Sequence, residues 1–163
     1  MNEISDNIEI GITGKVSPTE IKELSKLFDS ENIKIIKLET KAAPGIYGIE
    51  EIIDIIFRDY SIIDFARDFI LANLINYSWK KVKKVINYFN NKALKKVQQI
   101  SFNYIVIINN REVSLVVVCR PEEIELMLEE INKEINYEII IKEDFDRIIH
   151  VVYKNGKFDL TIM

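Results

Sequence analysis

The chain has few of the residues that build disulfides, metal sites and most active centres. It contains one cysteine, Cys119, and one histidine, His150, among 163 residues. A single cysteine excludes an intramolecular disulfide, and a zinc site would need its other ligands from His150 and scattered carboxylates. Cys119 and His150 could pair as nucleophile and base only if the fold brought them together, and nothing near either residue supports catalysis. We therefore expect a protein that is not an enzyme and that binds no metal or cofactor.

The sequence also lacks a long apolar run and an apolar leader. Residues 69–79 are the longest apolar stretch without an acidic side chain, whereas a membrane-spanning helix needs roughly 20 apolar residues. Residues 1–6 are polar and acidic, unlike a secretory signal, which begins with basic and then apolar residues. We therefore expect a cytoplasmic protein with no membrane span.

Glycine and proline are scarce, with five and three residues, and no linker or internal repeat divides the chain. A length of 163 residues suits one domain, and 48% hydrophobic content is enough to fill one core. A net charge of −4 is too small for self-repulsion to keep the chain disordered. We expect a single α+β domain over residues 1–163, in which residues 137–163 are the one candidate for an accessory set of β-strands.

Strand-like patterns occupy residues 8–12, 33–38, 104–108, 113–119, 137–141, 148–153 and 158–162. Asn109-Asn110 and Asn155-Gly156 each separate two of these segments. Asparagine and glycine tolerate the positive φ that a two-residue turn requires, so both dipeptides predict β-hairpins.

Helical patterns occupy residues 18–28, 49–57, 62–89 and 121–134. Ser17 and Glu20 form a capping box at the start of the first segment. Residues 49–57 are apolar around most of a helix circumference, residues 62–89 carry a long apolar stripe, and residues 59–61 interrupt the two. The order βαβ(αα)ββαβββ predicts an α+β fold, with a single mixed or antiparallel sheet packed against a long apolar helical pair.

No acidic residue lies between Asp68 and Glu112, although seven lysines fall in that interval. They are Lys80, Lys81, Lys83, Lys84, Lys92, Lys95 and Lys96. Such a cluster attracts an acidic protein face, nucleic acid or anionic lipid, and a solvated helix end explains it equally well. The net charge of −4 is unlike the general basicity of nucleic-acid binders. The acidic residues within 122–130 are a solvated face or the acceptor of these lysines in a second copy, which would give a homo-oligomer.

Two glycine pairs resemble ligand-binding loops without matching them. Gly11 and Gly14 precede Lys15 after a strand, but a phosphate-binding P-loop has four residues between its glycines and Lys-Ser/Thr directly after. The turn at residues 45–48 resembles the loop that clamps a nucleic-acid backbone in KH modules, but its two central residues are bulky and apolar. An ordinary turn explains the first pair, and a tight turn packed on the core explains the second.

The order of the elements and the turn Ala43-Pro44-Gly45-Ile46-Tyr47-Gly48 resemble the effector-associated constant component family of small bacterial conflict-system proteins. The resemblance covers about residues 8–131. It implies a non-catalytic adaptor that couples an effector, such as a protease or NTPase, to a trigger in a bacterial defence or signalling system. The chain differs from the family pattern in its last three predicted strands and in the bulky residues at positions 46 and 47.

The resemblance and the charge pattern together predict a protein-interaction module. Its predicted partner-binding residues are Lys80, Lys81, Lys83, Lys84, Pro44, Gly45, Tyr47 and Gly48. The alternative is a nucleic-acid or nucleotide sensor that uses the lysines between positions 80 and 96.

Overall fold

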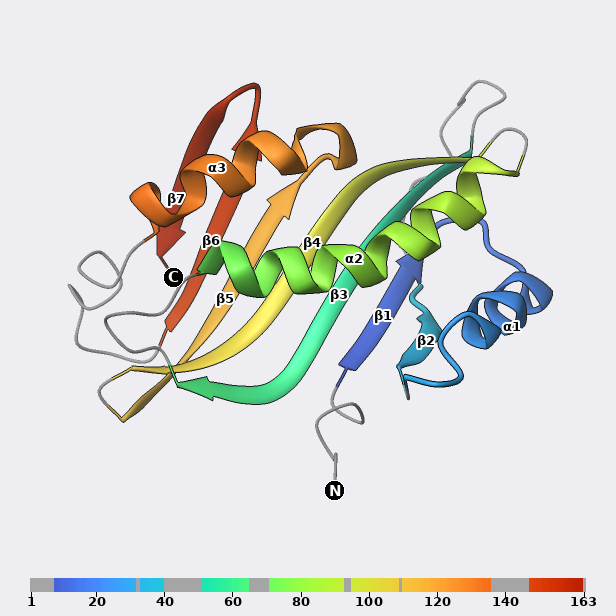
Figure 1. The fold of residues 1–163 in the computed structure, drawn as a ribbon, viewed down its shortest axis with the longest axis horizontal. Coiled ribbons are helices and arrows are strands. Elements are labelled where there is room, and N and C mark those ends of the chain that lie inside the picture. Colours follow the sequence, from blue (N-terminus) through green and yellow to red (C-terminus); the bar gives the residue numbers. More distant parts are fainter. Residues whose placement is uncertain are drawn as a thin grey trace.

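The computed structural model of the protein describes residues 8–31, 33–39, 51–64, 71–92, 95–108, 110–135 and 147–162. These residues form an α+β fold with one mixed seven-stranded sheet (Figure 1). In chain order the elements are β1 (Ile8–Thr13), α1 (Pro18–Lys26), β2 (Lys34–Lys37), β3 (Glu51–Asp64), α2 (Leu71–Asn90), β4 (Lys95–Ile108), β5 (Arg111–Cys119), the 3-10 helix η2 (Pro121–Glu123), α3 (Ile124–Glu134), β6 (Arg147–Lys154) and β7 (Lys157–Ile162).

The strands lie in the order β2-β1-β3-β4-β5-β6-β7. β1 and β2, β3 and β4, and β5 and β6 are parallel pairs, and a helix lies between the two strands of each pair in the sequence. The other neighbours, β1 with β3, β4 with β5 and β6 with β7, are antiparallel. A parallel pair needs a long connection, which explains why a helix separates its strands in the sequence.

The predicted capping box and both predicted hairpins are confirmed. The Ser17 hydroxyl accepts a hydrogen bond from the backbone N–H of Glu20 at 3.1 Å, and the Glu20 carboxylate accepts one from the backbone N–H of Ser17 at 3.0 Å. Asn110 has a φ of 63° at the β4–β5 turn. Asn155 and Gly156 have φ values of 54° and 77° at the β6–β7 turn, as a two-residue turn of this kind requires.

The helix predicted over residues 49–57 is wrong, because its described part belongs to the long strand β3. Ile53 and Phe57 are fully buried on the face that the helices cover, while Ile52 and Ile56 turn to the other face. β3 lies inside the sheet between β1 and β4. Because Ile52 and Ile56 add apolar side chains on the second face, the sequence lacks the strict alternation of a half-buried strand.

The predicted helical pair is replaced by one helix in the described part of the chain. α2 begins at Leu71, and Ile62, the first residue of the second predicted helix, belongs to β3. From Leu71 onward the predicted apolar stripe is confirmed, since Ile75, Val82 and Phe89 are fully buried. The strand predicted over residues 137–141 lies outside the described residues.

The interruption predicted near residues 59–61 is a bulge in β3. The pairing of β3 with β4 moves from Asp59 opposite Tyr104 to Ile62 opposite Ile105, so β3 has extra residues at this point. The Asp59 carboxylate accepts a hydrogen bond from the backbone N–H of Ser61 at 2.9 Å. This local contact stabilises the bulge in place of the lost ladder bonds.

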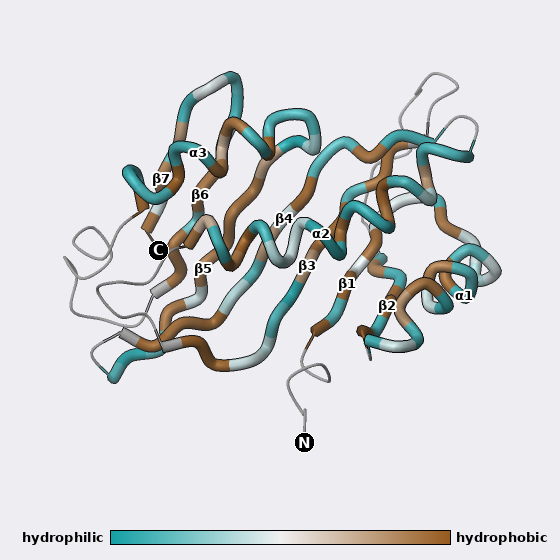
Figure 2. Tube along the Cα trace, viewed as in Figure 1, coloured by the Kyte–Doolittle hydropathy of each residue, from teal (hydrophilic) through white to brown (hydrophobic). Residues whose placement is uncertain are grey.

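One hydrophobic core lies between the sheet and the helices. α2 crosses the middle of the sheet, and α3 lies next to it on the same face (Figure 1). Phe57, Phe102, Val117 and Val151 form a row across four neighbouring strands, and each is 0% exposed. Figure 2 shows hydrophobic residues along the strands and alternating colours along α2, the pattern of a helix with one buried side.

The opposite face of the sheet carries no helix in the described part of the chain, and we name it the open sheet face. Ser114 and Val116 of β5 and His150 and Val152 of β6 point to it and are half-buried. Residues that alternate with them, such as Val117, are buried under the helices. Among the described residues, helices therefore cover one side of the sheet and leave the other side without a helix.

Candidate partner-binding surfaces

The lysines predicted to bind a partner lie on α2, but two of them bind within the chain. The Nζ atoms of Lys81 and Lys84 donate to the two carboxylate oxygens of Glu31, at 2.8 and 2.9 Å. Burial alone would lower the pKa of Lys81, but its hydrogen bond to Glu31 raises the pKa above the usual value. The hydrogen bonds from Lys81 and Lys84 lower the pKa of Glu31. These contacts fasten the segment after α1 to α2.

Two further lysines contact acidic residues of α1. Lys95 Nζ lies 2.8 Å from Glu20 Oε1, and Lys92 Nζ lies 3.7 Å from Glu23 Oε2. The Tyr88 hydroxyl donates to the same Glu23 carboxylate. Within the chain, four of the seven clustered lysines therefore face glutamates of residues 20–31. Sequence reasoning missed this complementarity because 50 to 75 positions separate the hydrogen-bonded partners.

Three lysines of the cluster remain exposed without an acidic contact to the described residues: Lys80, Lys83 and Lys96. Lys83 Nζ lies 5.4 Å from the centre of the Trp79 ring, a cation–π arrangement. The remaining predicted docking residues lie outside the described residues; they are Pro44, Gly45, Tyr47 and Gly48.

Close packing accounts for the glycines near Lys15. A Cβ atom on Gly11 would lie 2.4 Å from Leu38 Cδ1, so Leu38 occupies the space above this glycine. Gly14 has a φ of 110°, and a Cβ atom there would lie 2.5 Å from the carbonyl oxygen of Ile52. These contacts support an ordinary strand end followed by a turn, as the spacing predicted.

Cys119 and His150 point to opposite faces of the sheet. Cys119 shares the helix-covered face with Val117 and is buried, and burial raises the pKa of its thiol to about 12, with added effects of Glu123 and Glu122. His150 lies opposite Val116 in the β5–β6 pairing and therefore shares the open sheet face. The fold does not bring together these two residues, which were the only candidates for a nucleophile and a base.

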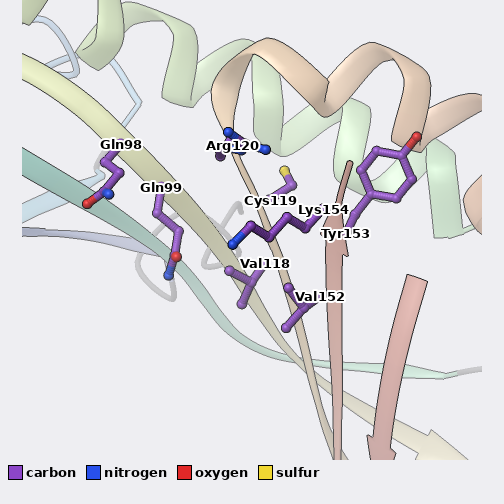
Figure 3. Close-up of a pocket in the computed structure, with 8 residues that line it drawn as sticks. All are labelled: Gln98, Gln99, Val118, Cys119, Arg120, Val152, Tyr153 and Lys154. Carbon is purple, nitrogen blue, oxygen red and sulfur yellow. The ribbon is translucent and has the colours of Figure 1, made fainter. Parts of the chain in front are cut away.

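A shallow pocket of about 180 Å³ lies where β5 and β6 end (Figure 3). It is lined by Gln98, Gln99, Val118, Cys119, Arg120, Val152, Tyr153 and Lys154. Its volume is below the roughly 300–1,000 Å³ of ordinary ligand pockets. Arg120 is already engaged, because Nη2 donates to Asn155 Oδ1 at 2.7 Å and Nε donates to Glu123 Oε2 at 3.1 Å. These bonds hold the β6–β7 turn against the start of α3.

The open sheet face has a row of three isoleucines and one serine across four strands. Ile62 lies opposite Ile105, Ile105 opposite Ser114, and Ser114 opposite Ile148. Ile62 is 66% exposed and Ile148 is 44% exposed, while the two residues between them are half-buried. We name these four residues the open-face row. It combines apolar side chains, solvent access and a rigid strand framework.

Two charged side chains of the open sheet face contact each other. Arg58 Nη1 lies 3.2 Å from Glu9 Oε1, and the Tyr60 hydroxyl donates to the same oxygen at 3.3 Å. Burial raises the pKa of Asp54, which also accepts a backbone hydrogen bond from Gln99. On this face Arg58 and Glu9 thus neutralise each other, and Glu112, two positions from Ser114 on β5, is an exposed acidic side chain.

The fold and these surfaces define a class: a mixed-sheet α+β protein with one covered and one open sheet face. In the described part of the chain, no helix is long and apolar enough to cross a membrane. Nor do three or more His, Cys, Asp or Glu side chains there form a group that could hold a metal ion. Comparison of the chain with protein-family models, curated proteins and solved structures finds no match. The family resemblance therefore stays a prediction.

Proposed function

We propose that the protein is a non-catalytic protein-interaction adaptor that binds its partner through the open sheet face. The open-face row supports this proposal most directly, because Ile62 and Ile148 expose large apolar side chains at its two ends, with half-buried Ile105 and Ser114 between them. Scattered apolar residues are ordinary on protein surfaces, whereas contiguous ones mark interaction sites.

The chemistry of this face fits a folded protein partner. The centre of a protein interface is poor in charge and rich in apolar side chains, and the charged Glu9 and Arg58 near the row already contact each other. The family resemblance adds the kind of partner: an effector, such as a protease or NTPase, that the adaptor couples to a trigger in a bacterial defence or signalling system.

Nucleic-acid or nucleotide sensing by the lysine cluster is the competing proposal. The contacts of Lys81 and Lys84 with Glu31 reduce the positive field that this function needs. Lys80, Lys83 and Lys96 keep their exposed charge. A sensor that used them would bind duplexes with a steep dependence on salt, because phosphate contacts release counterions.

The test is capture of partners by the tagged protein from native lysate at moderate salt, with and without nuclease. The open-face variant combines Ile62→Lys with Ile148→Lys, two exposed positions where the substitutions leave the core intact. The matched surface variant combines Lys80→Glu with Lys83→Glu. Lys81 and Lys84 are kept, because their substitution would break the contacts with Glu31.

We expect a protein that survives nuclease, is retained by the Lys80/Lys83 variant and is lost by the open-face variant. Retention by the open-face variant with loss by the lysine variant would place the interface on α2. Capture of nucleic acid alone, abolished by nuclease and by higher salt, would replace the adaptor with the sensor.

A further inference from the structure

β7 is the last strand of the sheet, and among the described residues no strand pairs with its outer edge. It has no proline and pairs with β6 without a bulge, so two common devices that block an edge are missing. A two-residue turn ends in a hydrogen-bonded pair, here Lys154 and Lys157. Along an antiparallel ladder, hydrogen-bonded pairs alternate with pairs whose backbone groups do not bond to each other. The backbone groups of Phe158, Leu160 and Ile162 therefore point away from β6.

The same three residues place their side chains on the helix-covered face. Phe158 lies opposite Tyr153, with the ring centres 4.7 Å apart, and Leu160 lies opposite the fully buried Val151. Leu160 and Ile162 are nevertheless each 37% exposed. The hydrophobic core thus continues to the edge of the sheet and ends there in partly exposed apolar side chains.

A second copy of β7 fits this edge when the two strands run antiparallel about a two-fold axis at Leu160. Leu160 then faces its own copy, and Phe158 faces Ile162 of the other chain. These are the residues with outward backbone groups, so the same register forms the hydrogen-bonded pairs. On the open sheet face, Asp159 lies opposite Thr161, a compatible polar pair.

Other registers fit less well. An axis at Asp159 would place two carboxylates opposite each other in the pair type where side chains approach most closely. An axis at Phe158 would leave Leu160 and Ile162 without apolar partners, and an axis at Thr161 would leave Phe158 without one. The Leu160 register alone pairs all three apolar side chains of the edge.

We infer that two copies of the chain associate through β7 in the Leu160 register and form one continuous sheet. The axis is perpendicular to the sheet, so the two open sheet faces lie on the same side of the dimer. Such a dimer would present two copies of the open-face row to a partner, although self-association does not depend on the function of that row. A single strand pair is a small interface, so the dimer forms in a concentration-dependent way.

Sedimentation equilibrium of the full chain over a concentration series tests this inference. Leu160→Pro removes an outward N–H while sparing the ladder with β6, and Leu160→Lys places two ammonium groups at the axis. Each should weaken dimerisation by more than about tenfold. The matched control is Thr161→Lys, which adds the same charge one position away, opposite Asp159 of the second copy. It should dimerise at least as well as the unaltered chain at low salt.

Amide hydrogen exchange of the unaltered chain gives a readout that needs no variant. The Thr161 N–H points to β6 and should be protected at every concentration, whereas the N–H groups of Leu160 and Ile162 should gain protection only as the concentration rises. A chain that stays monomeric throughout, or a dimer that both Leu160 variants retain, would overturn the inference. Equal loss of the dimer with Thr161→Lys and Leu160→Lys would also contradict the proposed register.

Discussion

Gly14 shows how a single residue controls the approach of two backbone segments. Its φ of 110° lies in a region that residues with a Cβ rarely adopt, and the Ile52 carbonyl oxygen occupies the space where a Cβ would stand. The sequence predicted a turn at Gly14 from the spacing near Lys15. It could not show that a strand beginning more than thirty positions later closes over this glycine, because that contact depends on the tertiary fold.

Gly14→Ala should therefore destabilise the protein by about 1–3 kcal/mol, since the substitution adds both backbone strain and a clash with Ile52. The control is Gly156→Ala, at a φ of 77° with no atom within 4 Å of the added Cβ. That change brings strain alone and should cost about 1–2 kcal/mol. Urea unfolding measures both. A Gly14→Ala variant no less stable than Gly156→Ala would show that the contact with Ile52 relaxes freely.

At the scale of elements, charge complementarity between distant segments positions α1. The glutamates of residues 20–31 meet lysines of α2 and β4, and Glu31 alone binds both Lys81 and Lys84. The lysine cluster was visible in the sequence as a charge run. The sequence did not show that these lysines bind glutamates within the chain, because the glutamates occur in a separate segment that only the fold brings near.

Glu31→Gln should lower the free energy of unfolding at pH 7 by about 1–3 kcal/mol, because Lys81 keeps a buried charge without its carboxylate partner. The folded-state pKa of Glu31 is lowered from 4.5. The stability that the ionised Glu31 contributes is therefore fully present above pH 4.5, the pKa of the unfolded state, and it declines as the pH falls through the lower pKa of the folded state. Urea unfolding at several pH values should show the difference between the two proteins shrinking below about pH 4.5.

The matched control for that experiment is Lys80→Gln, an exposed position on the same helix. It should change stability by less than about 0.5 kcal/mol at every pH. A constant difference between the unaltered protein and Glu31→Gln across the acid range would mean that the carboxylate charge does not stabilise the contact between α2 and the segment after α1.

β3 was assigned wrongly from the sequence, whereas the strands β1 and β5 were predicted. Over most of their length β1 and β5 alternate buried and less buried residues, which the sequence shows as period two. β3 is covered by helices at Ile53 and Phe57 and still has apolar Ile52 and Ile56 on the other face. A segment that is apolar on every side fits a buried helix as well as an inner strand, and only its partners β1 and β4 decide between them.

At the scale of the whole molecule, the core passes without a break into β6. Ile149 and Val151 are nearly or fully buried and belong to the same hydrophobic cluster as Trp79 of α2. β6 also pairs with β5 along six positions, from Val113 to Val118. From the sequence, residues 137–163 could be an accessory set of strands or part of the main sheet. A strand pattern shows which side is buried, but it does not show which element covers that side.

Continuity of this core predicts that the protein unfolds as one unit. Ile149→Ala, at a position 1% exposed, should remove about 2–5 kcal/mol of stability by leaving a cavity. Because α2 shares that core, fluorescence of Trp79, the single tryptophan, should report the same shifted urea midpoint as far-ultraviolet circular dichroism. The control is Ile148→Ala, 44% exposed on the open sheet face, with an expected change of less than about 0.5 kcal/mol. If Ile149→Ala instead split the transition and left the Trp79 midpoint in place, β6 and β7 would form a separate unit that merely extends the sheet.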